Sequence, residues 1–287
     1  MILYHYCSNE TLLSILSGKE IWASELSLSN DHLEGTWVRE VMSELCDEQK
    51  VKEADKVRLL SEFDRVASFI GAAGFCLSEE GDLLSQWRGY ASDGTGVSIG
   101  FSAEYFEALS KGFREREQSG FKLEKVTYDL AEQKRILSIP LQKMLQLVEK
   151  GAFRRPYGGL LIQPTEEEKS QYIGAYKRLS LEFLMLGLGT YSMKNPAFQE
   201  EIEWRLISIV TRGLNEVDGD LPAMEYRASA DRVIPFRKFP LLSLSIPVIE
   251  KIILGPRNIT PMPVIKGALS RYGFPDVEVI RSTASYR

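Results

Sequence analysis

Residues 203–210 read Glu203-Trp204-Arg205-Leu206-Ile207-Ser208-Ile209-Val210. The length and the β-branched content of this stretch are typical of a buried β-strand. Two more segments have the same character, Gly74–Ser78 and Val97–Phe101, and the second follows a tight turn at Asp93–Gly96. These three segments predict a β-sheet at the centre of the fold.

Working outward from them, shorter strands are expected toward both ends of the chain, with helices between. Helical periodicity predicts two insertions, at about 36–72 and 130–190, a first helix that Ser8 or Asn9 caps, and a last one near 262–272. The other expected strands are 2–6, 21–24, 121–129, 224–228, 232–239, 248–254 and 276–280. The arrangement predicts one α+β domain over residues 1–287 rather than two.

The composition is that of a water-soluble protein. The 287 residues are 44% hydrophobic and 26% charged with a net charge of −5, which argues against a disordered chain and against general nucleic-acid affinity. We find no apolar run of about 18–20 residues and no secretion signal, and three cysteines without a CxxC pair suggest a reducing compartment. With only two histidines, His5 and His32, a zinc site is disfavoured. We expect a cytoplasmic protein with no membrane partner and no metal.

Polar residues on the first strand form one candidate site. The chain has no GxGxxG, GxxxxGK[ST], GxSxG or HExxH motif, so the candidates are local clusters instead. In Tyr4-His5-Tyr6, strand alternation places His5 on the face of Leu3 and Cys7. His5 is expected to be either a hydrogen-bonded core residue or a donor to a ligand.

A second cluster combines Ser78 with Gln86, Trp87, Arg88 and Tyr90. Two turns of helix at the latter positions would bring Trp87 and Gln86 each beside Tyr90. An amide, a guanidinium and flat aromatic rings suit a nucleotide-sized ligand. The alternative is that Trp87 packs into the core and Arg88 pairs with a carboxylate.

A third cluster stands at the head of the long strand. Glu201 and Glu203 would face the same side if the strand begins by residue 201, and Arg205 lies close to both. One of these carboxylates is a candidate catalytic group with a tuned pKa. The alternative is an exposed acidic strand end with a Glu–Arg pair.

Several motifs together resemble a bacterial domain-of-unknown-function family, number 2971, which carries no assigned activity. The resemblance extends over nearly the whole chain. Its motifs here are Leu3–Tyr6, Leu12–Leu16, Ile21–Ser24, Asn30–Gly35, Phe75–Ser78, Gln86–Ala91, Glu203–Arg205, Ile252–Pro256 and Tyr286–Arg287.

The order of parts also resembles, more remotely, that of ADP-ribosyltransferase-like folds: a strand with His before a helix, a strand ending in Ser, and a late strand headed by Glu. The resemblance implies a split, mostly antiparallel sheet, here with helical insertions, that binds NAD in its cleft. It implies His5 as the anchor for the ribose and nicotinamide half, and Ser78, with Tyr90 as a rival, beside nicotinamide. Glu203, or Glu201 if the register shifts, would hold the ribose 2′-hydroxyl.

The implied function is that of an NAD-dependent ADP-ribosyltransferase or NAD glycohydrolase of unknown acceptor. A buried carboxylate would stabilise the positive charge that develops on ribose. Trp87 or Tyr6 would stack on nicotinamide, and Arg88 or Arg205 would neutralise the diphosphate.

The segment containing Asn30, Asp31 and Glu34 has no counterpart in that superfamily. It is either helix-capping chemistry or an element that contacts the substrate or acceptor. Two other functions stay open: a non-enzymatic nucleotide- or partner-binding module, and a hydrolase or nuclease in which Asp31, Glu34 and Glu203 surround a divalent metal.

Overall fold

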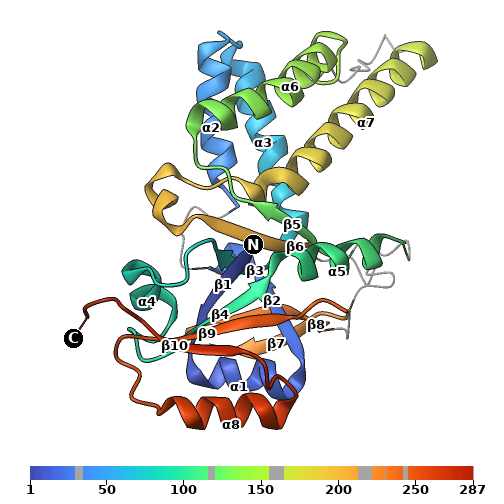
Figure 1. Ribbon diagram of the computed structural model, residues 1–287. Coiled ribbons are helices and arrows are strands. Elements are labelled where there is room, and N and C mark those ends of the chain that lie inside the picture. The colour runs from blue at the N-terminus through green and yellow to red at the C-terminus, as the bar shows by residue number, and fades with distance from the viewer. Residues whose placement is uncertain are drawn as a thin grey trace.

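A computed structural model describes residues 1–29, 35–115, 120–154, 165–212, 222–229, 231–241 and 245–286. In this part of the chain, strands and helices combine into a mixed α/β architecture (Figure 1). The strands are β1 (Ile2–Cys7), β2 (Glu20–Glu25), β3 (Ile70–Ser78), β4 (Val97–Ser102), β5 (Lys122–Lys125), β6 (Glu203–Thr211), β7 (Glu225–Ala228), β8 (Val233–Pro240), β9 (Ile249–Leu254) and β10 (Glu278–Arg281). The helices are α1 (Asn9–Gly18), α2 (Trp37–Glu48), α3 (Glu53–Phe69), α4 (Leu84–Tyr90), α5 (Ala103–Glu115), α6 (Leu130–Glu149), α7 (Glu166–Gly189) and α8 (Met262–Tyr272), with 3-10 turns η1 (Leu26–Leu28), η2 (Thr190–Ser192) and η3 (Pro196–Glu201).

All the named strands belong to one sheet. Its order is β10-β9-β4-β1-β3-β2-β8-β7, and β6 pairs with both β3 and β5. Every described pair of strands is antiparallel except β9 with β10. The expected α+β class with a mostly antiparallel sheet is therefore confirmed.

The sheet splits along one edge of β3. On its other edge, β3 pairs with β6 over its whole length, from Ile70 to Ser78. On the split edge, β1 meets β3 at Ser78, and β2 meets it at Ala73 and Gly74. Between these points β1 and β2 diverge, so the pairs described leave Phe75, Cys76 and Leu77 without a strand partner on that side. This opening is where the candidate site lies.

Two hydrophobic cores support the sheet and the helices. Leu12 and Leu16 of α1, Phe106 of α5 and Leu269 of α8 pack with buried strand residues into one core. The second core joins α2, α3, α6 and α7, which form a bundle at one end of the sheet, away from α1 and α8 (Figure 1). No helix in the described part of the chain has the length and apolar character needed to cross a membrane.

Two elements differ from the sequence analysis. β3 begins at Ile70, so residues 70–72, which the sequence predicts as the end of the first helical insertion, belong to the sheet. A short apolar run fits a buried strand and a helix end equally well, and pairing with β6 decides for the strand. No element is predicted from the sequence over 103–120, where the structure has α5.

Candidate functional site

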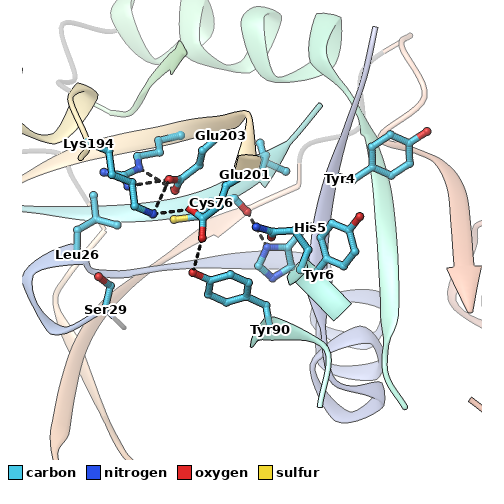
Figure 2. Close-up of a pocket in the computed structure, with 13 residues that line it drawn as sticks. Tyr4, His5, Tyr6, Leu26, Ser29, Cys76, Tyr90, Lys194, Glu201 and Glu203 are labelled. Atoms are coloured by element: carbon cyan, nitrogen blue, oxygen red, sulfur yellow. Dashed lines mark hydrogen bonds and ion pairs between the residues drawn. The ribbon is translucent and has the colours of Figure 1, made fainter. Parts of the chain in front are cut away.

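A cavity lies beside the split in the sheet. It encloses about 550 Å³, part of which is open to solvent. Its walls come from β1, the end of β3, α4, the start of β6 and the turn after β2, as Figure 2 shows. The lining residues are Tyr4, His5, Tyr6, Leu26, Ser29, Cys76, Leu77, Gln86, Tyr90, Lys194, Glu201, Glu203 and Arg205. Residues from the first, second and third sequence clusters are thus brought together.

His5 fills the split and has a defined tautomer. Its Nδ1 lies 2.8 Å from the carbonyl oxygen of Cys76, and its ring stacks on Phe75 with centroids 4.1 Å apart. A carbonyl only accepts, so Nδ1 carries the hydrogen. Burial lowers the pKa of His5 to about 4, so at neutral pH the ring is uncharged and Nε2 is an acceptor. His5 is thus hydrogen-bonded in the core, as the first of its two expected roles predicted; toward a ligand it would accept rather than donate, because its donor is used by the Cys76 carbonyl.

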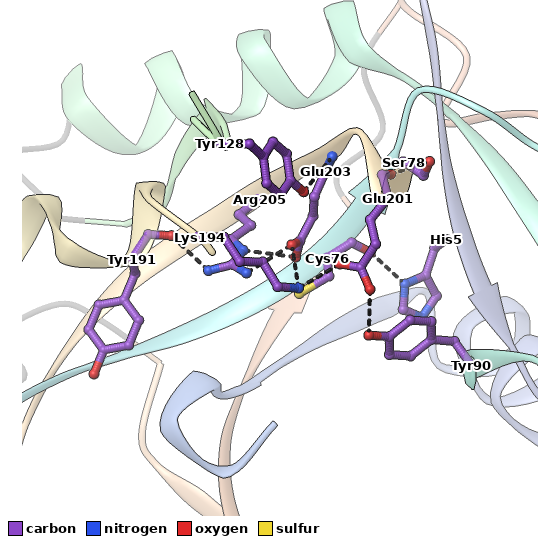
Figure 3. Close-up of polar contacts among 10 residues, drawn as sticks. All are labelled: His5, Cys76, Ser78, Tyr90, Tyr128, Tyr191, Lys194, Glu201, Glu203 and Arg205. Carbon is purple, nitrogen blue, oxygen red and sulfur yellow. Dashed lines mark hydrogen bonds and ion pairs between the residues drawn. The ribbon is translucent and has the colours of Figure 1, made fainter. Parts of the chain in front are cut away.

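Four buried charged side chains form an ion-pair network beside the cavity. This charged cluster consists of Lys194, Glu201, Glu203 and Arg205 (Figure 3). Arg205 Nε and Nη2 each lie 2.8 Å from a different oxygen of Glu203. Lys194 Nζ is 2.5 Å from Oε2 of Glu201 and 3.2 Å from Oε2 of Glu203. Two positive and two negative charges balance, which is what burial of charge requires.

The cluster holds Glu203 and Lys194 in their charged forms. Burial alone would raise the pKa of the Glu203 carboxyl, but Arg205, Lys194 and the Cys76 thiol lower it to about 2. Burial alone would lower the pKa of the Lys194 ammonium, but Glu203 and Glu201 together raise it. Both groups therefore stay ionised at neutral pH.

The two carboxylates differ in what they have left to offer a ligand. Both oxygens of Glu203 are bound by Arg205, and one also by Lys194. Oε1 of Glu201 accepts only the hydroxyl of Tyr90, at 3.0 Å, among the contacts of the described residues. Burial and the charge of Glu201 raise the pKa of Tyr90, which keeps this hydroxyl protonated. Glu201 is thus the carboxylate better placed to accept a ligand hydroxyl.

Strand alternation does not explain why the carboxylates of Glu201 and Glu203 lie close together. β6 begins at Glu203, and Glu201 ends the 3-10 turn η3. Between them Ile202 is left-handed, with φ 43, which turns Glu201 back toward Glu203. Alternation explains the other half of the cluster, because Glu203, Arg205 and Cys76 share one face of the β3–β6 pair.

Two residues of the candidate site were not predicted from the sequence. Lys194 bridges both carboxylates, and the hydroxyl of Tyr128 accepts a hydrogen bond from the backbone N–H of Glu203, at 3.2 Å. Neither residue belongs to a motif. The available signal was a need for positive charge: two carboxylates predicted to be buried together require more than one cation.

Other predicted ligand residues have structural partners instead. Ser78 is buried, outside the cavity lining, and its hydroxyl donates to the carbonyl of Glu201 at 2.7 Å. Trp87 is fully buried and its indole N–H donates to Asp82, so it has no open face for nicotinamide. Its bulky ring packs edge-on against Tyr6, as the core alternative predicted.

The guanidinium groups expected at a diphosphate are also engaged. Arg88 lies over the ring of Tyr286, outside the cavity lining, and Arg205 binds Glu203 and the carbonyl of Tyr191. Tyr6 lines the cavity, but its hydroxyl donates to the Glu80 carbonyl and accepts from the Leu83 N–H.

The fourth sequence cluster cannot be placed. Asn30, Asp31 and Glu34 lie outside the described residues. Within the residues that are described, no group of three or more His, Cys, Asp or Glu side chains is arranged to hold a metal ion.

Acidification is expected to destabilise the protein through His5. In the unfolded chain His5 takes a proton near its ordinary pKa of 6.5, but in the folded protein only near pH 4. Between these values the unfolded state binds more protons, so stability falls as the pH falls, by at most about 3 kcal/mol in total. Urea unfolding of the wild type and His5→Gln at about pH 7.5 and pH 4.5 measures this. The variant should lose less stability on acidification; an equal loss in both proteins would contradict the assignment.

Comparison with known proteins comes to one match. Residues 86–206 match the model of a family described as "Protein of unknown function (DUF2971)". The match supports the expected relation to that family. It includes the motifs Gln86–Ala91 and Glu203–Arg205, and therefore one wall of the cavity and all four residues of the charged cluster. No curated protein and no solved structure matches the chain.

Proposed function

We propose that the protein binds NAD along the split in its sheet and cleaves the nicotinamide–ribose bond, as an ADP-ribosyltransferase or an NAD glycohydrolase. The observation that carries this proposal is the pairing of two acceptors in one cavity, Oε1 of Glu201 and Nε2 of His5. Two acceptors in one cavity favour a ligand that presents two donors. The adjacent hydroxyls of a ribose meet that requirement.

The space beside this cavity suits a ligand longer than one nucleoside. A second cavity, of about 1300 Å³ and partly open to solvent, shares His5, Tyr6 and Tyr90 with the first. This second cavity lies along β2 and α1, and its lining includes Trp22 and Arg227. The guanidinium of Arg227, which also donates to Ser24 Oγ at 3.2 Å, would take the diphosphate role for which Arg88 and Arg205 were expected. The amide of Gln86, which lines the first cavity, would bind the carboxamide of nicotinamide.

The chemistry follows from a buried carboxylate at the wall of the cavity. When the bond between ribose C1′ and the nicotinamide nitrogen breaks, the electron pair goes to that nitrogen, which becomes neutral. Positive charge then develops on the ribose, and Glu201 stabilises it. Water or an acceptor hydroxyl, amine or carboxylate forms the new bond to C1′. A proton is released wherever the attacking group carries one.

A second candidate function is a non-enzymatic ligand-binding module. The specific observation in its favour is that every member of the charged cluster pairs with another member. Such a network positions side chains without needing to react.

Proton NMR of NAD mixed with the purified protein tests both functions. The expected result is the appearance of free nicotinamide, with saturation transfer from protein to the NAD ribose protons. Saturation transfer without nicotinamide would favour the binding module. The absence of both signals would refute NAD as the ligand.

A further inference from the structure

The C-terminal tail, from Ser282 to Tyr286, is hydrogen-bonded to the segment that leads into α4. Asp82, just before α4, accepts hydrogen bonds from the Ser282 hydroxyl at 2.5 Å and from the Thr283 N–H and hydroxyl at 2.7 and 2.8 Å. It also accepts the indole N–H of Trp87, at 2.7 Å, from inside α4. The tail and the helix are therefore joined through one carboxylate, and Figure 1 shows the C-terminal end beside α4.

Tyr286 makes a second attachment, beyond the C-terminal end of α4. Its hydroxyl donates to Asp93 at 2.6 Å, and Asp93 also pairs with Arg257. The guanidinium groups of Arg88 and Arg257 lie 6.0 and 5.8 Å from the centre of the Tyr286 ring. The closing tyrosine, which the proposed function leaves unused, thus binds both the last turn of α4 and the loop after it.

Apart from the buried side chains of Gln86 and Trp87, the helix has little of its own to hold it in place. α4 is seven residues long and has no side-chain N-cap, and helices this short are unstable alone. The loop that follows holds Ser92 and Asp93 at φ 50 and 53, a left-handed conformation that residues with a Cβ rarely adopt. The hydroxyl of Tyr286 donates to the carboxylate of Asp93, one of these two left-handed residues.

We propose that the C-terminal latch, Ser282, Thr283 and Tyr286, positions α4 so that Tyr90 stays against Glu201. The latch residues touch α4 and its flanking loops and do not line the cavity, so they are positioning residues. Their effect on a ligand rests on the proposed function, while their effect on α4 does not.

Hydrogen exchange of the α4 amides tests the latch without any ligand. In Tyr286→Ala, exchange over Leu84–Tyr90 is expected to be about tenfold faster than in the wild type, with β3 and β6 unchanged. Tyr286→Phe keeps the ring between the two guanidiniums and should give a smaller increase. The matched control is Tyr226→Ala, because Tyr226 is 70% exposed in β7 and should leave α4 unaffected. Unchanged exchange in α4 of Tyr286→Ala would overturn the proposal.

Calorimetric titration with NAD tests the consequence for the site. Tyr286→Ala is expected to weaken NAD binding about tenfold, but to have little further effect in a Tyr90→Phe background, since both changes act through one contact. Faster α4 exchange with unchanged NAD affinity would refute the positioning role. If the wild type does not bind NAD, the proposed function fails, and the exchange experiment alone decides whether the latch holds α4.

Discussion

Replacement of Lys194 by methionine is expected to lower the free energy of unfolding by about 3–5 kcal/mol at neutral pH. Lys194 Nζ contacts both Glu201 and Glu203, and all three side chains are buried. Without the ammonium, Arg205 still balances Glu203, but Glu201 keeps only the neutral hydroxyl of Tyr90. An uncompensated buried charge is among the most destabilising consequences of a single substitution. Chemical unfolding measures the loss.

Two companion variants identify the cause of that loss. Lys143→Met is the matched control, because the Lys143 side chain is 59% exposed and lies 3.9 Å from Glu182, so it should cost no more than about 1 kcal/mol. Adding Glu201→Gln to Lys194→Met removes the stranded charge and should restore part of the stability. A loss of less than about 1 kcal/mol in Lys194→Met would show that the cluster is not desolvated.

Substitution of Glu201 by glutamine is expected to slow nicotinamide release about 10²–10³-fold while changing NAD affinity little. The amide keeps the size of the side chain, and its carbonyl oxygen still accepts the Tyr90 hydroxyl, although the ion pair with Lys194 is lost. What disappears is the negative charge that the transition state needs, and the loss should therefore appear in kcat more than in KM. Initial rates of nicotinamide release at several NAD concentrations separate the two.

Glu200 supplies the control for this variant. It is the adjacent residue and exposed, so Glu200→Gln removes the same charge outside the cavity and should leave the rate unchanged. Glu203→Gln is a poorer probe, because it breaks the two-bond pair with Arg205 and costs stability as well. A Glu201→Gln rate within about threefold of the wild type would exclude Glu201 as the charge-stabilising carboxylate.

Local sequence patterns were sufficient wherever a segment's own neighbours decide its structure. The β-branched run beginning at Glu203 is a strand, Ser8 caps α1, and α2 and α3 follow the periodicity of their apolar residues. Where local preference was ambiguous, as at Ile70, the sheet decided instead. Pairing with a strand more than a hundred residues away cannot be read from a local window.

The sequence by itself determined the α+β class, most of the strands, and the presence of His5, Glu201 and Glu203 as polar residues in otherwise apolar surroundings. Only the tertiary structure decided what those groups do. It turned Glu201 back toward Glu203 through the left-handed Ile202 and placed Lys194 between the two carboxylates. It also used the one donor of His5 in a hydrogen bond to the Cys76 carbonyl. The physical reason is that alternation and helical period are local, whereas the charge balance and hydrogen bonds of a buried polar group depend on whichever distant segments the fold brings against it.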